Sequence, residues 1–262
     1  MIRQPADTKN AHAPDTFRLN AYRVLRLPAS ASAADIHRAA ASMRRAVTFG
    51  VPTMSEIDIP ELGALTRSDG EILAALDRLA DPVQRITDRL FWFCQLPTSY
   101  GAQLTTDAMA LTEHDRVLQV QFAAMRGGLD ANGLATWLKA LRGWHTLSRD
   151  ESYWFLTLIF EDYGSLEAPA TTEEIEALRG DAVRIAAEPL MIGARAAVDA
   201  GDKETVRRVI AVLSLLTDTG PWASAFINEL EKLSTPDAEH VGRVLAWAEP
   251  AWPTLRQPGR IL

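Results

Sequence analysis

The sequence predicts an all-α fold. Apolar residues recur with a helical period in nearly every segment, and helix-start and helix-stop residues separate these segments. No stretch of strict apolar–polar alternation is long enough to predict a strand. With 47% hydrophobic and 23% charged residues, the 262-residue chain has the composition of a folded protein. We expect one large helical domain or two smaller ones.

The first long helix is predicted between a Ser-x-x-Asp cap and a glycine. Ser32 and Asp35 can exchange hydrogen bonds at the helix start, and the helix should continue to about Phe49. Gly50 then provides the stop. A short helix over residues 20–25 is expected to precede it.

Two further helices are predicted from a capping box and an Asp-Pro pair. Ser68 and Glu71 form the capping box of a helix that should end near residue 80. Asp81 is then an N-cap with Pro82 at the first helical position, where proline is well tolerated. This helix is expected to continue through Phe93.

The rest of the chain is predicted to consist of helical hairpins. The expected helices cover residues 113–126, 133–147, 149–163, 173–200, 203–216, 221–233 and 236–248. A capping box from Ser148 to Glu151 should start the third of these. Gly180 or Pro189 should break the fourth, because proline in a helix interior costs about 3 kcal/mol. Short turns between the helices favour antiparallel pairs.

Residues 193–216 resemble a tetratricopeptide-type unit, with small residues on the first helix, a Gly-Asp turn and an aliphatic second helix. A consistent 34-residue period is absent, so we expect an irregular, solenoid-like arrangement. The last fourteen residues contain four prolines or glycines and should be extended.

Residues 17–93 resemble a J domain, the helical module of DnaJ-type co-chaperones. The match consists of NAYRVL at 20–25 with Leu27-Pro28, AADI at 33–36, and ALDRLADP at 75–82 followed by Arg85. A group of bacterial J-like proteins is similar in having a module that ends in an aromatic run and leads into a Trp-rich helical domain. The alternative is an unrelated capped hairpin with a Leu-rich face.

The J-domain resemblance implies a specific core. Tyr22, Leu25 and Leu27 should close over Ile36, Ala40 and Met43, and these should face Ile72, Leu76 and Leu79 in an antiparallel pair. Each such buried aliphatic side chain contributes about 1.5–3 kcal/mol before entropy is counted.

The trigger of working J domains is missing from this chain. J domains carry His-Pro-Asp in the loop after their second helix, and this tripeptide switches on the ATPase of DnaK-type chaperones. Here residues 50–67 have the sequence GVPTMSEIDIPELGALTR, and His-Pro-Asp occurs nowhere in the chain. The resemblance therefore implies a degenerate module that does not stimulate a DnaK-type ATPase, although docking on such a chaperone stays open.

These observations predict four regions. Residues 1–16 form a flexible N-terminus, 17–98 a J-domain-like module, 99–249 a helical-hairpin domain and 250–262 an extended tail.

Charge and composition exclude several classes of partner and site. Residues 1–98 have a net charge of about +1 and the remainder about −8, which argues against nucleic acid. The longest apolar runs are too short to cross a bilayer, and the N-terminus lacks a signal-peptide core. Cys94, the single cysteine, excludes an intramolecular disulfide and a cysteine-based zinc site. We expect a soluble cytoplasmic protein.

The sequence contains no recognisable active site. Phosphate-binding, dinucleotide-binding, nucleophile-elbow and zinc-protease motifs are all absent. His114 lies between Glu113 and Asp115, but we expect this trio at a helix start, where acidic residues favour the helix dipole. Cys94 is expected to be a small buried hydrophobe. Glu161 and other carboxylates cannot be assembled into a site from sequence, so we predict no catalytic, cofactor or metal residues.

Two aromatic stripes are expected in the hairpin domain. The first is Trp137, Leu141 and Trp144, and the second is Trp154, Phe155, Leu158 and Ile159. Packing of the two helices against each other would bury both stripes in a core. An aromatic groove for a partner segment is the alternative.

Taken together, the sequence predicts a non-enzymatic adaptor or scaffold that binds another protein, without a cofactor. The candidate contact region combines basic and aromatic side chains: Arg38, Arg44, Arg45, Phe91, Trp92 and Phe93. Two alternatives are a regulator that docks on a DnaK-type chaperone without stimulating it, and a helical enzyme or small-ligand-binding protein. Homo-oligomerisation also stays open.

Overall fold

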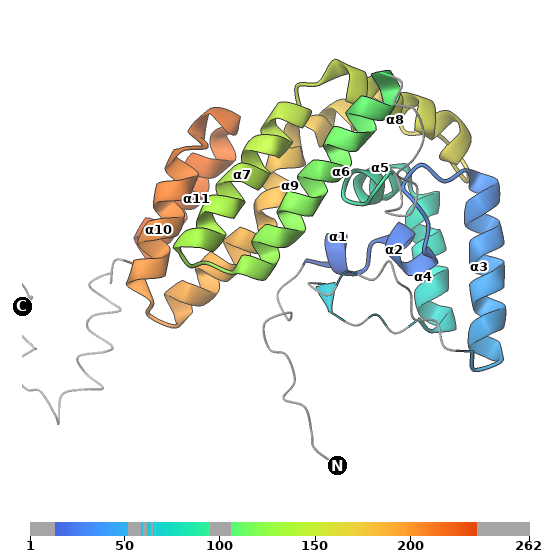
Figure 1. Ribbon diagram of the computed structural model, residues 1–262, viewed down its shortest axis with the longest axis horizontal. Helices are drawn as coiled ribbons and strands as arrows, with labels where there is room; N and C mark the ends of the chain where they lie inside the picture. Colours follow the sequence, from blue (N-terminus) through green and yellow to red (C-terminus); the bar gives the residue numbers. More distant parts are fainter. Residues whose placement is uncertain are drawn as a thin grey trace, which may run out of the picture. The chain divides into compact units, whose positions relative to one another are not determined.

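The computed structural model describes residues 14–51, 67–94 and 106–234, together with Ile59, Leu62, Gly63 and Leu65. Its regular structure within these ranges is helical, with no strand, which confirms the all-α prediction (Figure 1). The predicted helix 236–248 and the extended tail lie outside the described residues, as does most of the predicted N-terminal segment. No helix in the described ranges is both long and apolar enough to cross a membrane.

The chain divides into two compact units, Met1–Gly193 and Ala194–Leu262. The helices of the first unit are α1 (Asp15–Arg18), α2 (Ala21–Leu25), α3 (Ala33–Thr48), α4 (Asp69–Ala80), α5 (Pro82–Leu90), α6 (Thr106–Gly127), α7 (Ala131–Leu147) and α8 (Glu151–Gly164). Helix α9 (Thr172–Asp199) begins in the first unit and ends in the second. The second unit continues with α10 (Lys203–Ser214), the 3-10 helix η4 (Thr217–Thr219) and α11 (Pro221–Ser234).

The three predicted N-terminal caps are confirmed. Ser32 and Asp35 form a capping box at α3, and Ser68 and Glu71 form one at α4. The Asp81 side chain accepts a hydrogen bond from the Gln84 N–H at the start of α5, with proline at the first helical position. Helix α5 ends at Leu90, three residues before the predicted end.

Helices α3 and α4 lie side by side and run antiparallel (Figure 1). Arg44, near the end of α3, pairs with Asp69, at the start of α4, as expected for antiparallel helices. Helix α2 packs on both, and the Arg67 side chain donates to the backbone carbonyls of Arg23 and Val24. The buried core of this region includes Tyr22, Leu25, Ile36, Ala40, Met43, Ile72 and Leu79, whereas Leu27 and Leu76 are half-buried.

Helices α6 and α7 form a tight antiparallel hairpin. The Asp130 side chain accepts a hydrogen bond from the Gly133 N–H and so caps α7. At Gly133 the two backbones approach so closely that a Cβ would lie 2.4 Å from the Gly128 carbonyl oxygen and 2.7 Å from that of Gly127. Glycine is therefore required here for lack of space.

Two predicted helix starts are corrected. Helix α6 begins at Thr106 rather than at residue 113. Helix α8 is capped by Asp150, whose carboxylate accepts hydrogen bonds from the backbone N–H groups of Ser152 and Tyr153. Ser148 instead ends α7, so the predicted capping box from Ser148 to Glu151 does not form. An aspartate two residues downstream outcompetes the serine for the role of cap.

The predicted break in α9 is also wrong, because the helix continues through both Gly180 and Pro189. One face of this helix is buried in the first unit, through Ala182, Ala186 and Leu190. Pro189 lacks the N–H that would pair with the Ile185 carbonyl, and the Gln121 side chain donates to the adjacent Ala186 carbonyl. Tertiary contacts thus offset the cost of the proline.

The second unit contains a small core between α10 and α11. Val206, Val209 and Leu213 of α10 and Ala223, Phe226 and Leu230 of α11 are buried. Arg195, at the end of α9, pairs with Glu229 and lies over the Phe226 ring. The resemblance of residues 193–216 to a tetratricopeptide-type unit stays a prediction.

The predicted boundary between residues 98 and 99 falls inside the first unit. Side chains from before and after this boundary meet in a common core. Arg85 and Arg89 of α5 pair with Glu161 of α8, and the Cys94 N–H donates to Asp115 of α6. These long-range contacts join the predicted module to the helices that follow it.

Candidate functional site

The solvent side of α3 presents a basic and aromatic surface. Arg38, Ser42, Arg45 and Phe49 are spaced as i, i+4, i+7 and i+11, so they share one stripe, and all four are exposed. We call these four residues the α3 stripe. Phe49 is 79% exposed, which is unusual for so large an apolar side chain.

Two of the three predicted contact arginines have acidic neighbours. Arg38 pairs with Asp35 at 2.6 Å, and Arg44 pairs with Asp69 at 2.5 Å. Both pairs are exposed and screened by water, so each adds little stability and the guanidinium can exchange partners. Arg45 is exposed on the same helix and has no ion-pair partner in the described ranges.

An open groove of about 500 Å³ lies beside the stripe. It runs between the segment before α3 and the first two turns of that helix, and Arg38 lies on its wall. Its lining is mostly small and apolar: Leu27, Pro28, Ser30, Ala31, Asp35, Arg38, Ala39 and Ser42. Such a surface can accept a peptide segment, but its lining offers a single carboxylate and no histidine for catalysis.

The predicted aromatic part of the contact region is buried instead. Phe91 and Trp92 are almost fully buried, and Phe93 is 8% exposed. Phe91 packs on Phe17 and Trp144, and Phe93 packs on Phe122, so the run joins α1, α6 and α7. We therefore remove Phe91, Trp92 and Phe93 from the proposed contact surface, because side chains in a core are not available to a partner.

A buried ionic cluster connects α5 with α8. The Glu161 carboxylate pairs with both Arg85 and Arg89, and all three side chains are essentially inaccessible to solvent. The Arg85–Glu161 distance is 2.7 Å, and the Ala170 N–H also donates to Glu161 at 3.1 Å. Other arginine donors reach backbone carbonyls, including that of Ala29, and one reaches the Tyr22 hydroxyl. Every charge in the cluster is thus hydrogen-bonded, as buried charges must be.

Tyr22 of α2 extends the ionic cluster. Its hydroxyl accepts a hydrogen bond from Arg89 at 3.0 Å. Burial raises the pKa of Tyr22 even though Arg89 opposes the shift, so the phenol stays neutral. Gly164, at the end of α8, lies against the cluster. A side chain larger than hydrogen would not fit there, since a Cβ would lie 2.4 Å from the Arg89 guanidinium. This packing points to a structural role.

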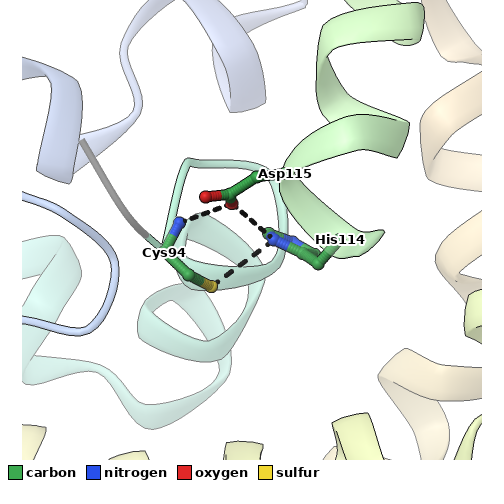
Figure 2. A group of neighbouring side chains, drawn as sticks. All are labelled: Cys94, His114 and Asp115. Carbon is green, nitrogen blue, oxygen red and sulfur yellow. Dashed lines mark hydrogen bonds and ion pairs between the residues drawn. The ribbon is translucent and has the colours of Figure 1, made fainter. Parts of the chain in front are cut away.

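A second buried cluster brings together Cys94, His114 and Asp115 (Figure 2). The Cys94 Sγ lies 3.4 Å from His114 Nδ1, and Asp115 Oδ1 lies 3.1 Å from the same nitrogen. The His114 Nε2 lies 2.7 Å from the Leu90 carbonyl oxygen, to which it must donate. The ring also stacks on Tyr153, with 4.9 Å between centroids. We call these three side chains the Cys–His–Asp cluster.

The surroundings of His114 favour its protonated form. Burial alone would lower the pKa of this imidazole, but the neighbouring Cys94 and the hydrogen bond with Asp115 outweigh it and raise the pKa to about 10. With no metal bound, both ring nitrogens therefore carry protons at neutral pH. Thiolate, imidazole and carboxylate are also the side chains that hold transition metals in proteins.

Sequence reasoning missed the Cys–His–Asp cluster for two reasons. It placed His114 at a helix start, whereas α6 begins two turns earlier, and it treated Cys94 as apolar. A usable signal was present, because His114 shares a helix face with the apolar Leu118 and with Gln121, both of which are buried. A histidine on a buried face needs polar partners.

The first aromatic stripe is confirmed as core, since Trp137, Leu141 and Trp144 are buried. The second stripe is only partly buried. Trp154 is buried, but Phe155 is 63% exposed and Leu158 is also exposed. Helix α8 packs on α6 with its other side, which leaves these two residues facing outward.

Comparison with known proteins gives no further indication of function. No protein-family model matches the chain, and neither a curated protein nor a solved structure matches it.

Proposed function

We propose that the chain is a cytoplasmic, non-enzymatic adaptor that binds an acidic surface of another protein through the α3 stripe. The observation that carries this proposal is the exposure of Phe49 in line with Arg38 and Arg45. Aromatic and arginine side chains are the ones that most often dominate binding energy at protein interfaces. The open groove beside Arg38 adds room for a partner segment.

The charge of the α3 stripe and of the neighbouring Arg44 favours an acidic partner. Arg38, Arg44 and Arg45 outnumber the acidic residues that pair with them, Asp35 and Asp69. Exposed arginines can exchange such weak intramolecular pairs for carboxylates of a partner. The J-domain resemblance is compatible with this surface, because working J domains dock through a basic second helix.

Alanine at Arg38, Arg44 and Arg45 together is expected to abolish capture of the partner from the protein's own cells. The matched control places alanine at Arg149, Arg207 and Arg208, which are also exposed and change the net charge equally. The control bait should recover as much partner as the wild type. Equal recovery by both variants would contradict the proposal.

The identity of a captured partner separates the candidate functions. A DnaK-type chaperone would favour the co-chaperone alternative, and its ATPase rate with and without this chain would then be measured. We expect no stimulation, because the chain lacks His-Pro-Asp. A different, stoichiometric partner would support the adaptor.

Phe49→Ser is expected to weaken partner binding at least tenfold while leaving the free energy of unfolding within about 0.5 kcal/mol of the wild type. The side chain is exposed, so its loss removes little from the core. Leu215 in the second unit is also a large, exposed apolar residue. Leu215→Ser therefore serves as the control and should leave binding unchanged. A titration of the captured partner against the three proteins, together with urea unfolding, gives both quantities.

A further inference from the structure

We propose that Cys94, His114 and Asp115 bind a single zinc ion within the first unit, contrary to the expectation from sequence that the single cysteine excludes such a site and that the chain has no metal residues. The three residues offer one ligand atom each, and these atoms lie within 4.8 Å of one another. They come from two separate parts of the chain, the segment after α5 and the third turn of α6, and their side chains point toward one another (Figure 2).

The spacing of the ligand atoms fits a tetrahedral zinc ion. Zinc bonds of about 2.0–2.3 Å hold neighbouring nitrogen and sulfur ligands about 3.5 Å apart, and nitrogen and oxygen ligands about 3.4 Å apart. The corresponding distances are 3.4 Å from His114 Nδ1 to Cys94 Sγ and 3.1 Å from the same nitrogen to Asp115 Oδ1. The third pair, Cys94 Sγ and the Asp115 carboxylate, lies within 4.8 Å, so the thiol and the carboxylate would draw together around the ion.

The second ring nitrogen of His114 also has the partner that a metal ligand needs. Nε2 donates to the Leu90 carbonyl, which fixes the ring orientation and directs Nδ1 into the cluster. Zinc-bound histidines usually donate their other N–H to a carbonyl or carboxylate in this way. The backbone N–H of Cys94 donates to Asp115, so that carboxylate is oriented too.

A zinc ion would replace the hydrogen-bonded network of the metal-free cluster. The thiol and the carboxylate both approach Nδ1, which has room for one proton or one lone pair. A cation between the three groups interacts with all of them. Its binding would release the Nδ1 proton and the thiol proton to solvent, and would leave a fourth position for water. The ion would link the segment that follows α5, through Cys94, to α6, through His114 and Asp115.

Cobalt(II) titration of the purified, chelator-treated full-length protein tests this site. Because Cys94 is the single cysteine, any thiolate-to-cobalt charge-transfer absorption must come from it. We expect this band together with tetrahedral cobalt absorption, saturation at one equivalent, and displacement by one equivalent of zinc. Absence of the charge-transfer band, or octahedral cobalt alone, would overturn the proposal.

Variants assign the ligands. Asp115→Asn keeps an oxygen that can accept from the Cys94 N–H, yet should weaken zinc binding more than about tenfold, since even outer-shell changes cost that much. Cys94→Ser should remove the charge-transfer band. His145→Gln, on α7 outside the cluster, is the control and should bind as the wild type does. Circular dichroism checks that each variant is folded. Wild-type affinity in the folded Asp115→Asn protein would contradict the assignment.

Discussion

Glu161→Gln is expected to lower the free energy of unfolding by about 3–5 kcal/mol, as measured by urea unfolding followed by tryptophan fluorescence. The carboxylate neutralises two arginines, Arg85 and Arg89, that are buried with it. Glutamine keeps one oxygen acceptor but removes the negative charge. Both guanidinium groups would then stay buried without a counter-charge, which costs far more than the lost hydrogen bonds.

The same substitution at Glu151 provides the control. Glu151 is on the same helix and pairs with Arg179, but its side chain is 81% exposed. Water screens that ion pair, so Glu151→Gln should lower the free energy of unfolding far less than Glu161→Gln does. If the two variants lose equal stability, the Arg85–Arg89–Glu161 cluster does not hold α5 to α8 as described.

Gly133→Ala is expected to destabilise the protein by about 3 kcal/mol, at the upper end of the cost of overpacking. A Cβ at this position would lie 2.4 and 2.7 Å from two backbone carbonyl oxygens at the end of α6. Backbone atoms cannot rotate away as a flexible side chain can, so α6 and α7 would have to separate. Their separation would also loosen the packing of Trp137 and Trp144.

Gly180→Ala is the control, because it adds the same methyl group at a position where a Cβ has room. Gly180 lies in α9, and a Cβ there would have no atom within 4 Å. Alanine should stabilise the helix by about 0.5–1 kcal/mol, because glycine loses more conformational freedom on folding. Urea unfolding of the two variants should therefore show changes of opposite sign. A loss of stability for both would contradict the close approach at Gly133.

Local signals in the sequence predicted most of the fold. The capping boxes at Ser32 and Ser68 and the Asp-Pro pair at Asp81 were each found where they were expected. The predicted cap at Ser148 failed because Asp150 caps α8 instead, and the predicted break in α9 failed because tertiary contacts override local preference. Pro189 stays within a helix because the helix is packed and Gln121 donates to a carbonyl near it. No periodicity reveals such a contact.

The candidate sites were less predictable than the fold. The exposure of the α3 arginines could be predicted, because a helical period shows which residues lie on the solvent side, and their role in binding stays a prediction. The aromatic run at Phe91 was misjudged, because a chain of aromatic residues has the same sequence whether it is exposed or covered by helices from 50 residues away. The partners Cys94 and His114, and likewise Arg89 and Glu161, are 20 and 72 residues apart. Their meeting depends on the tertiary fold.

The most direct test of the proposed contact surface is photo-crosslinking in the protein's own cells. A photo-reactive phenylalanine analogue in place of Ser42 lies between Arg38 and Arg45 on the α3 stripe, and the same analogue in place of the exposed Ser224 on α11 is the control. We predict one prominent crosslinked protein from position 42 and none from position 224. No crosslink from position 42, or the same products from both positions, would contradict binding through the α3 stripe.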